Sequence, residues 1–93
     1  MIFISYSSRD YDTARTIKKV LESNGIECWM APESIPIGSD YAYEIPNAIE
    51  SCTAFLLVLS KSAQNSNWVP KELDLAITYN KSVIPFQIDG EML

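Results

Sequence analysis

Two side chains with complementary chemistry stand four residues apart in the stretch NWVPKE, residues 67–72. Trp68 offers an aromatic face and Glu72 offers a carboxylate. Residues i and i+4 of a helix share a face, so a helix that begins here places the indole beside the carboxylate. One interpretation is a solvated acid that is favoured by the dipole at the start of a helix. The other is a reactive carboxylate next to an aromatic platform, and the rest of the sequence must distinguish between them.

The composition restricts the chemistry that is available. The chain has no histidine, which excludes the usual Ser-His and Cys-His catalytic pairs and removes a common zinc ligand. Cys28 and Cys52 belong to no metal-spaced pair and are predicted to be reduced thiols in the core. We therefore expect no metal site, and any catalysis must rely on carboxylates, hydroxyls or amines.

Size and charge limit the class of protein and its partners. The chain has 93 residues, 47% of them hydrophobic, which fits one small globular domain. A formal net charge of −5 without a basic stripe argues against a nucleic acid partner. The longest apolar run, residues 54–59, is far too short to cross a bilayer, so no membrane partner is expected. No signal peptide is visible, and we expect a cytoplasmic protein.

Hydrophobic periodicity and turn signals predict four strands that alternate with three helices. Ser7 and Asp10 have the spacing of a capping box before the first helix, and Gly25 is expected to end that helix in a left-handed conformation. Pro46 is expected to make the second helix irregular. The predicted strands are residues 2–6, 26–30, 53–60 and 82–89, the later helices are residues 41–52 and 68–80, and residues 61–67 are a predicted polar loop.

This alternation with short connections predicts an α/β fold, a three-layer sandwich in which helices cover both faces of a parallel sheet. Residues 53–60 form a continuous apolar run and are expected to be buried on both faces. No helix follows the last predicted strand, so we expect that a C-terminal strand and helix are missing and that the natural protein continues beyond Leu93. One stripe of the last helix is assigned to the core: Val69, Leu73, Ala76 and Ile77.

Other families with this alternation lack their motifs here. Gly25, Gly38 and Gly90 are too far apart for a dinucleotide-binding fingerprint or a P-loop. An α/β-hydrolase needs a Gly-x-Ser-x-Gly turn and a histidine, and the chain has neither. A two-component receiver needs acids after its first and third strands, where this chain has SYSS and LSKS.

Four segments in order together resemble a TIR domain, of the Toll/interleukin-1 receptor type, and look most like bacterial TIR domains. They are FISYSSRD, APESIPIGSDY, AFLLVLSKSA and WVPKEL. The resemblance covers residues 1–93 and implies a flavodoxin-like fold. Members of the family usually have a fifth strand and a closing helix, which this sequence lacks.

The resemblance implies one of two functions. Many bacterial TIR domains, plant immune receptors and an animal axon-degeneration enzyme cleave NAD+ to nicotinamide and either ADP-ribose or a cyclic isomer. Enzymatic members have a Trp-x-x-x-Glu arrangement, which Trp68 and Glu72 match. It implies an NAD+ nucleosidase in antiphage defence, with Glu72 catalytic, Trp68 in the substrate site, NAD+ as substrate and no cofactor. The alternative is a non-catalytic scaffold for TIR–TIR assembly, and scaffolds commonly lack the glutamate.

Further site residues follow from the carboxyl end of the first strand and from the resemblance. Ser5, Tyr6, Ser7 and Arg9 could donate hydrogen bonds to ribose or diphosphate, although surface capping residues would have the same pattern. An aromatic residue after the loop glycine often stacks on the ligand in the family. Tyr41 is the first choice for that role here, and Tyr43 is the second.

Residues 31–40 contain two prolines and a glycine, so they are expected to form a long functional loop. The loop resembles the BB loop of the family, which gates the site and joins neighbouring subunits. Other TIR domains are therefore expected partners, in an oligomer or filament on which activity depends. The residues assigned to assembly are Pro32, Ile35, Pro36, Ile37 and Gly38.

Overall fold

The structure, a computed structural model, describes residues 1–88. Its sheet has the strand order β2-β1-β3-β4, and all neighbouring strands are parallel. This is the flavodoxin-like order and confirms the predicted fold class. The elements are β1 (Ile2–Ser5), a 3-10 turn η1 (Ser8–Asp10), α1 (Tyr11–Ser23), β2 (Cys28–Trp29), α2 (Tyr41–Ser51), β3 (Ala54–Leu59), α3 (Lys61–Gln64), α4 (Val69–Thr78) and β4 (Ser82–Gln87).

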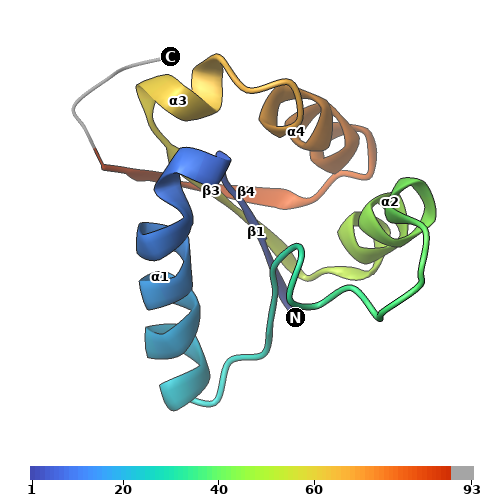
Figure 1. The fold of residues 1–93 in the computed structure, drawn as a ribbon, viewed down its shortest axis with the longest axis horizontal. Helices are drawn as coiled ribbons and strands as arrows, with labels where there is room; N and C mark the ends of the chain where they lie inside the picture. Colours follow the sequence, from blue (N-terminus) through green and yellow to red (C-terminus); the bar gives the residue numbers. More distant parts are fainter. Residues whose placement is uncertain (89–93) are drawn as a thin grey trace.

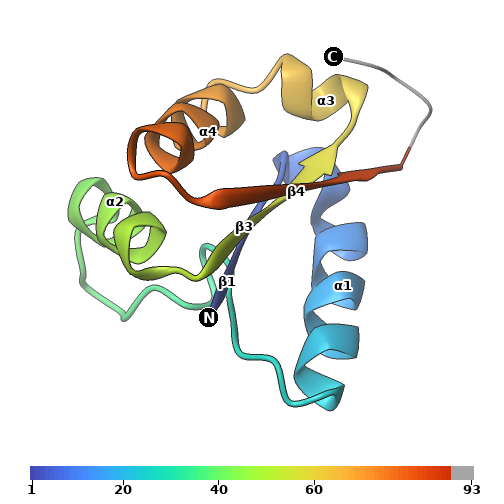
Figure 2. The same ribbon diagram turned by 180° about the vertical axis from the view of Figure 1, so that it is seen from behind.

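The helices form two layers on opposite sides of the sheet (Figures 1 and 2). Alternate residues of β3 serve the two layers. Leu56 and Val58 pack with α1, whereas Phe55 and Leu57 pack with α2, α3 and α4. Because five of the six residues of β3 are buried, the prediction of a strand covered on both faces is confirmed.

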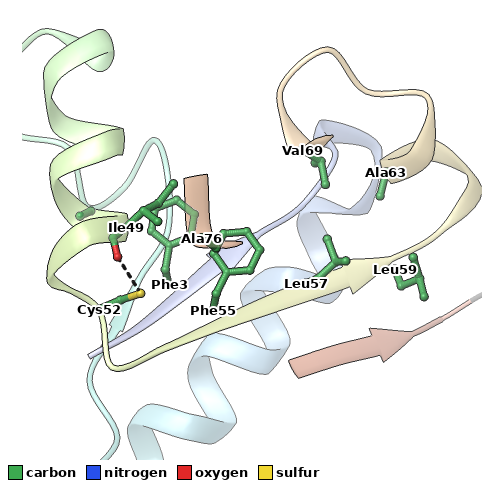
Figure 3. Close-up of a cluster of buried hydrophobic side chains, with 10 residues drawn as sticks. Phe3, Ile49, Cys52, Phe55, Leu57, Leu59, Ala63, Val69 and Ala76 are labelled. Carbon is green, nitrogen blue, oxygen red and sulfur yellow. Dashed lines mark hydrogen bonds between the residues drawn. The ribbon is translucent and has the colours of Figure 1, made fainter. Parts of the chain in front are cut away.

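Stacked aromatic rings form the centre of the core on the α2 side (Figure 3). The ring of Phe3 lies 5.4 Å from that of Phe55 and 5.0 Å from that of Trp29. Cys52 closes this cluster, and its thiol donates a hydrogen bond of 3.0 Å to the Ile49 carbonyl. Cys28 and Cys52 are both buried and free, as the sequence predicts.

Three helical features differ from the sequence-based expectations. Residues 61–64 of the predicted loop form α3, because the Ser60 hydroxyl caps it by accepting from the Ala63 N–H at 3.0 Å. Helix α2 continues unbroken through Pro46. The lost donor would have paired with the Ala42 carbonyl, near the exposed start of the helix. The predicted capping box forms only in part: Ser7 accepts from the Arg9 N–H at 3.4 Å.

Two further predictions, on Ile77 and on β2, are wrong. Ile77 is not in the core but is 59% exposed, since α2 lies against the opposite flank of α4, where Leu75 is partly buried. Strand β2 has two residues rather than the predicted five: Cys28 and Trp29 pair with Ile2 and Phe3 of β1, and the chain turns from Ala31 onward. The predicted end of β4 at Asp89, and the expectation that the chain continues beyond Leu93, lie outside the described residues. Within residues 1–88, no helix has the length and apolar character that crossing a bilayer requires.

Strand β4 lies at the other edge of the described sheet and is mostly exposed. Ile84 and Phe86 pair in register with Leu56 and Val58, so their side chains lie on the α1 face of the sheet. Both are more than 40% exposed. The four-residue strand β1, by contrast, is central and nearly fully buried, and its carboxyl end leads directly to the site described next.

Candidate active site

Helix α4 carries Glu72 in its first turn. The Ser66 hydroxyl prepares the start of the helix by accepting hydrogen bonds from the N–H groups of Trp68 and Val69, at 3.1 and 3.3 Å. Pro70 is tolerated because a first-turn residue needs no helical N–H bond. The N–H of Glu72 donates to the Trp68 carbonyl at 3.0 Å, so this turn holds the indole and the carboxylate in a fixed relation.

The Glu72 carboxylate is partly buried and held by the sheet. Ser5, the last residue of β1, is 1% exposed, and its hydroxyl donates a hydrogen bond of 2.7 Å to Glu72 Oε1. Burial raises the pKa of Glu72 to about 7, and the hydrogen bond from Ser5 partly opposes this shift. Glu72 is therefore not the solvated acid of a helix start but a carboxylate that changes ionisation near neutral pH.

Glu72 lines a cavity of about 330 Å³, which we call the Glu72 cavity. Strand β1, the loop after β2, the start of α2 and the start of α4 all contribute to its walls. The volume is at the lower end of the range for small-molecule sites. Its other walls include Phe3, Tyr6, Pro32, Tyr41, Ile45 and Trp68.

Two further cavities adjoin the Glu72 cavity, and Trp68 lines all three. One, of about 540 Å³, is bounded by η1, α3 and the loop before α4, and we call it the polar cavity. The other, of about 400 Å³, lies between α2 and α4 and is mostly apolar, and we call it the α2–α4 groove. Trp68 is 66% exposed, with Lys71 Nζ 5.7 Å from its ring centre, so much of the indole is open to a ligand.

The predicted ligand-binding residues fall into different parts of this cleft. Tyr6 and Tyr41 line the Glu72 cavity, and Tyr41 also lines the groove. Tyr43 is exposed and lines none of the three. Ser7 and Arg9 line the polar cavity instead.

Tyr6 is fixed by its own hydroxyl, which donates to the Ala31 carbonyl. Burial, together with the neighbouring Tyr11 and acidic groups, raises the pKa of Tyr6 to about 12. Tyr6 therefore stays protonated and ties the end of β1 to the loop after β2. This contact holds one wall of the Glu72 cavity in place.

The loop at residues 31–40 has a buried base and an exposed tip. Ile35 is buried, whereas Ile37 is fully exposed. Gly38 has φ of +85°, a conformation that side chains disfavour, so glycine suits this turn. Glu33 ties the loop to α1 by accepting from the Tyr11 hydroxyl and lying 3.7 Å from Lys18 Nζ.

A sequence model of the TIR domain matches residues 2–93. The chain belongs to the TIR domain family. No curated protein matches the sequence significantly. Within residues 1–88, no three histidine, cysteine, aspartate or glutamate side chains are grouped so that they could hold a metal ion in this TIR domain.

Solved structures share the fold. A metazoan TIR-STING receptor from C. gigas is 28% identical, with a TM-score of 0.81 over 96% of this chain and 31% of that chain. The TIR domain of the Toll-related receptor TRR-2 from Hydra magnipapillata is 22% identical, with a TM-score of 0.88 over 99% of this chain and 73% of that one. The TIR domains of the activated Roq1 resistosome, which recognises the pathogen effector XopQ, are 22% identical, with a TM-score of 0.85 over 97% and 58%. This TIR domain thus spans less than a third of the TIR-STING receptor chain and less than two thirds of the Roq1 chain.

Sequence reasoning missed the residues that follow β3. In this TIR domain β1 and β3 are neighbours, so their carboxyl ends open on the same crevice. The polar segment KSAQNSN follows β3, and its Lys61, Asn65 and Asn67 line the polar cavity. The rule that placed SYSSRD at the site applies equally to this segment and could have found it.

Proposed function

We propose that this TIR domain is an NAD+ nucleosidase that cleaves the bond between nicotinamide and ribose. The observation that carries the proposal is the partly buried Glu72 carboxylate, which Ser5 holds in a cavity beside the exposed indole of Trp68. The reaction needs a negative charge at a fixed place in a partly dry cleft, and Glu72 supplies one. It needs no metal or histidine, because the leaving nicotinamide already carries positive charge.

The reaction proceeds by breaking the C–N bond, whose electron pair passes to the pyridine nitrogen and makes the leaving nicotinamide neutral. The ribose becomes an oxocarbenium-like cation at the carbon that was bonded to nitrogen, and the ionised Glu72 stabilises it. Water then bonds to that carbon and releases a proton, which yields ADP-ribose. Attack by a group of the same molecule would instead give a cyclic isomer.

The size of the electrostatic effect is large enough to decide activity. Two unit charges about 4 Å apart attract by about 4 kcal/mol at an effective dielectric constant of 20. This corresponds to about a thousandfold in rate, since about 1.4 kcal/mol gives a factor of ten. The carboxylate must be ionised to act, so the pKa of about 7 for Glu72 permits activity at and above neutral pH.

The test is incubation with NAD+ and mass detection of nicotinamide and the ribose product. Glu72→Gln keeps the size and the acceptor for Ser5 but removes the charge, and we expect it to lower the rate by about a thousandfold. Asp74→Asn is the matched control, because Asp74 is an exposed acid on the same helix. Equal rates for Glu72→Gln and the native chain would reject the proposed function.

We further propose that catalysis requires assembly with other TIR domains in the cytoplasm, within bacterial antiphage defence. The support for assembly is the loop tip at Ile37, a large apolar side chain that is fully exposed. The same observation favours a second candidate function, a scaffold that joins TIR domains without catalysis. A chain that self-associates but releases no nicotinamide at any concentration would support the scaffold over the enzyme.

A further inference from the structure

The charged side chains of residues 1–88 that line the polar cavity are cationic, although the whole chain carries a formal net charge of −5. Two cationic side chains, Arg9 and Lys61, line it together with serine, asparagine and Trp68. No aspartate or glutamate of residues 1–88 lines it, although the chain has 12 acidic and 7 basic residues. The acid next to Arg9 in sequence, Asp10, accepts a hydrogen bond from the buried Ser60 hydroxyl. Cationic groups that line a cavity favour an anionic ligand there.

The donors in the polar cavity match phosphate in particular. A guanidinium group presents paired N–H donors that bind phosphate oxygens in a bidentate manner, and an ammonium group binds them as a point charge. The amide of Asn67 adds a neutral donor group, whereas the Asn65 amide already donates one hydrogen bond of 3.0 Å to the Lys61 carbonyl and has one N–H left. The cavity of about 540 Å³ is larger than the Glu72 cavity and has room for more than a single small ion.

The three cavities lie next to one another, and the chemistry of their walls differs from one end of the cleft to the other. The polar cavity adjoins the Glu72 cavity, because Ser8, Ser66 and Trp68 line both. The α2–α4 groove adjoins the Glu72 cavity between α2 and α4, and Tyr41, Trp68 and Glu72 line both. A ligand that crosses the cleft therefore passes from mostly apolar walls, past a carboxylate, to cationic walls.

We propose that the polar cavity binds the diphosphate of the dinucleotide substrate, with Arg9 and Lys61 as its principal ligands. This rests on the proposed function for the position of the scissile bond at Glu72, and it adds the orientation of the substrate. The nicotinamide lies toward α2, and the adenosine diphosphate half extends past the indole of Trp68 toward η1 and α3. Arg9 and Lys61 are thus assigned to affinity for the phosphorylated substrate rather than to bond cleavage.

A binding experiment tests the cavity without any turnover. The affinity of the chain for ADP-ribose and for adenosine is measured by isothermal titration calorimetry. We expect ADP-ribose to bind more tightly than adenosine, and Arg9→Gln and Lys61→Gln each to weaken ADP-ribose binding about tenfold, which equals about 1.4 kcal/mol. The matched control is Lys19→Gln, which removes the same charge from an exposed position on α1, outside the three cavities. ADP-ribose that binds no more tightly than adenosine, or equally well to both variants, overturns the proposal.

A kinetic experiment tests the orientation. The ratio of kcat/KM for NAD+ to that for nicotinamide riboside, which has no diphosphate, is compared among variants. We expect Arg9→Gln and Lys61→Gln to lower this ratio about tenfold. Lys71 lines the α2–α4 groove, so a fall in Lys71→Gln alone would place the diphosphate there and overturn the proposed orientation. If no NAD+ is cleaved, the proposed function fails, and the calorimetric result still decides whether the cavity binds a diphosphate.

Discussion

Replacing Glu72 by glutamine is expected to stabilise the fold at alkaline pH even as it removes the proposed catalytic charge. Burial raises the folded-state pKa of Glu72 from 4.5 to about 7, so the ionised carboxylate opposes folding. The native chain is expected to lose stability as the pH rises from about 4.5 to about 7, and to lose no more from this group above that. One pKa unit equals about 1.36 kcal/mol, so the loss amounts to about 3 kcal/mol.

The assay is urea unfolding at pH 5 and pH 8, followed by circular dichroism for the native chain, Glu72→Gln and Asp74→Asn. Glutamine stays neutral at both pH values and retains an oxygen that can accept the Ser5 hydrogen bond of 2.7 Å. The free energy of unfolding of Glu72→Gln should therefore exceed that of the native chain at pH 8 by about 3 kcal/mol and approach it at pH 5. Asp74→Asn should follow the native chain. Parallel pH profiles for the native chain and Glu72→Gln would refute the view that burial strains this carboxylate.

Three other outcomes follow from the same structure. The kcat/KM for NAD+ should rise with pH through about 7 as Glu72 ionises. Ser5→Ala should move this rise to higher pH, because it removes the hydrogen bond that lowers the pKa of Glu72. A pH profile that Ser5→Ala leaves unchanged contradicts this. Ile37→Asp should change the free energy of unfolding by less than about 0.5 kcal/mol, since the side chain is fully exposed. The same substitution should lower the specific activity at high protein concentration. If the specific activity of the native chain is independent of protein concentration, that result argues against assembly. Phe55→Ala should cost about 3–5 kcal/mol in urea unfolding, because the ring is fully buried and stacked 5.4 Å from that of Phe3; a cost below about 1 kcal/mol contradicts the core described here.

Much of the fold is predictable because strand and helix periods are strong local signals. The continuous apolar run of β3 predicts burial on both faces, and Gly25 ends α1 with φ of +78° as expected. Ile77 shows the limit of such signals. Helical spacing places Ile77 beside Leu73, but the prediction that Ile77 is buried is wrong. Burial depends on which flank of α4 packs against α2, and local sequence does not determine that.

The site is less predictable, for a similar reason. The pairing of Trp68 with Glu72 is local and follows from helical spacing. The hydrogen bond between Ser5 and Glu72 joins residues 67 positions apart, and it depends on how α4 packs against the end of β1. In the same way Ser60, whose hydroxyl both caps α3 and donates to Asp10, gives no local sign of its second contact. Single-sequence reasoning identifies which residues could act, and packing decides which of them meet.

The two tryptophans give the molecule separate optical reporters. Trp29 stacks on Phe3 in the core at 5.0 Å, whereas Trp68 is 66% exposed at the cleft. In a chain with Trp68 replaced by phenylalanine, the tryptophan emission comes from the core indole alone and reports unfolding. In a chain with Trp29 replaced in the same way, the tryptophan emission comes from the indole at the cleft and reports occupancy of the cleft. Parallel fluorescence titrations of the two chains therefore separate ligand binding from unfolding, without any added label.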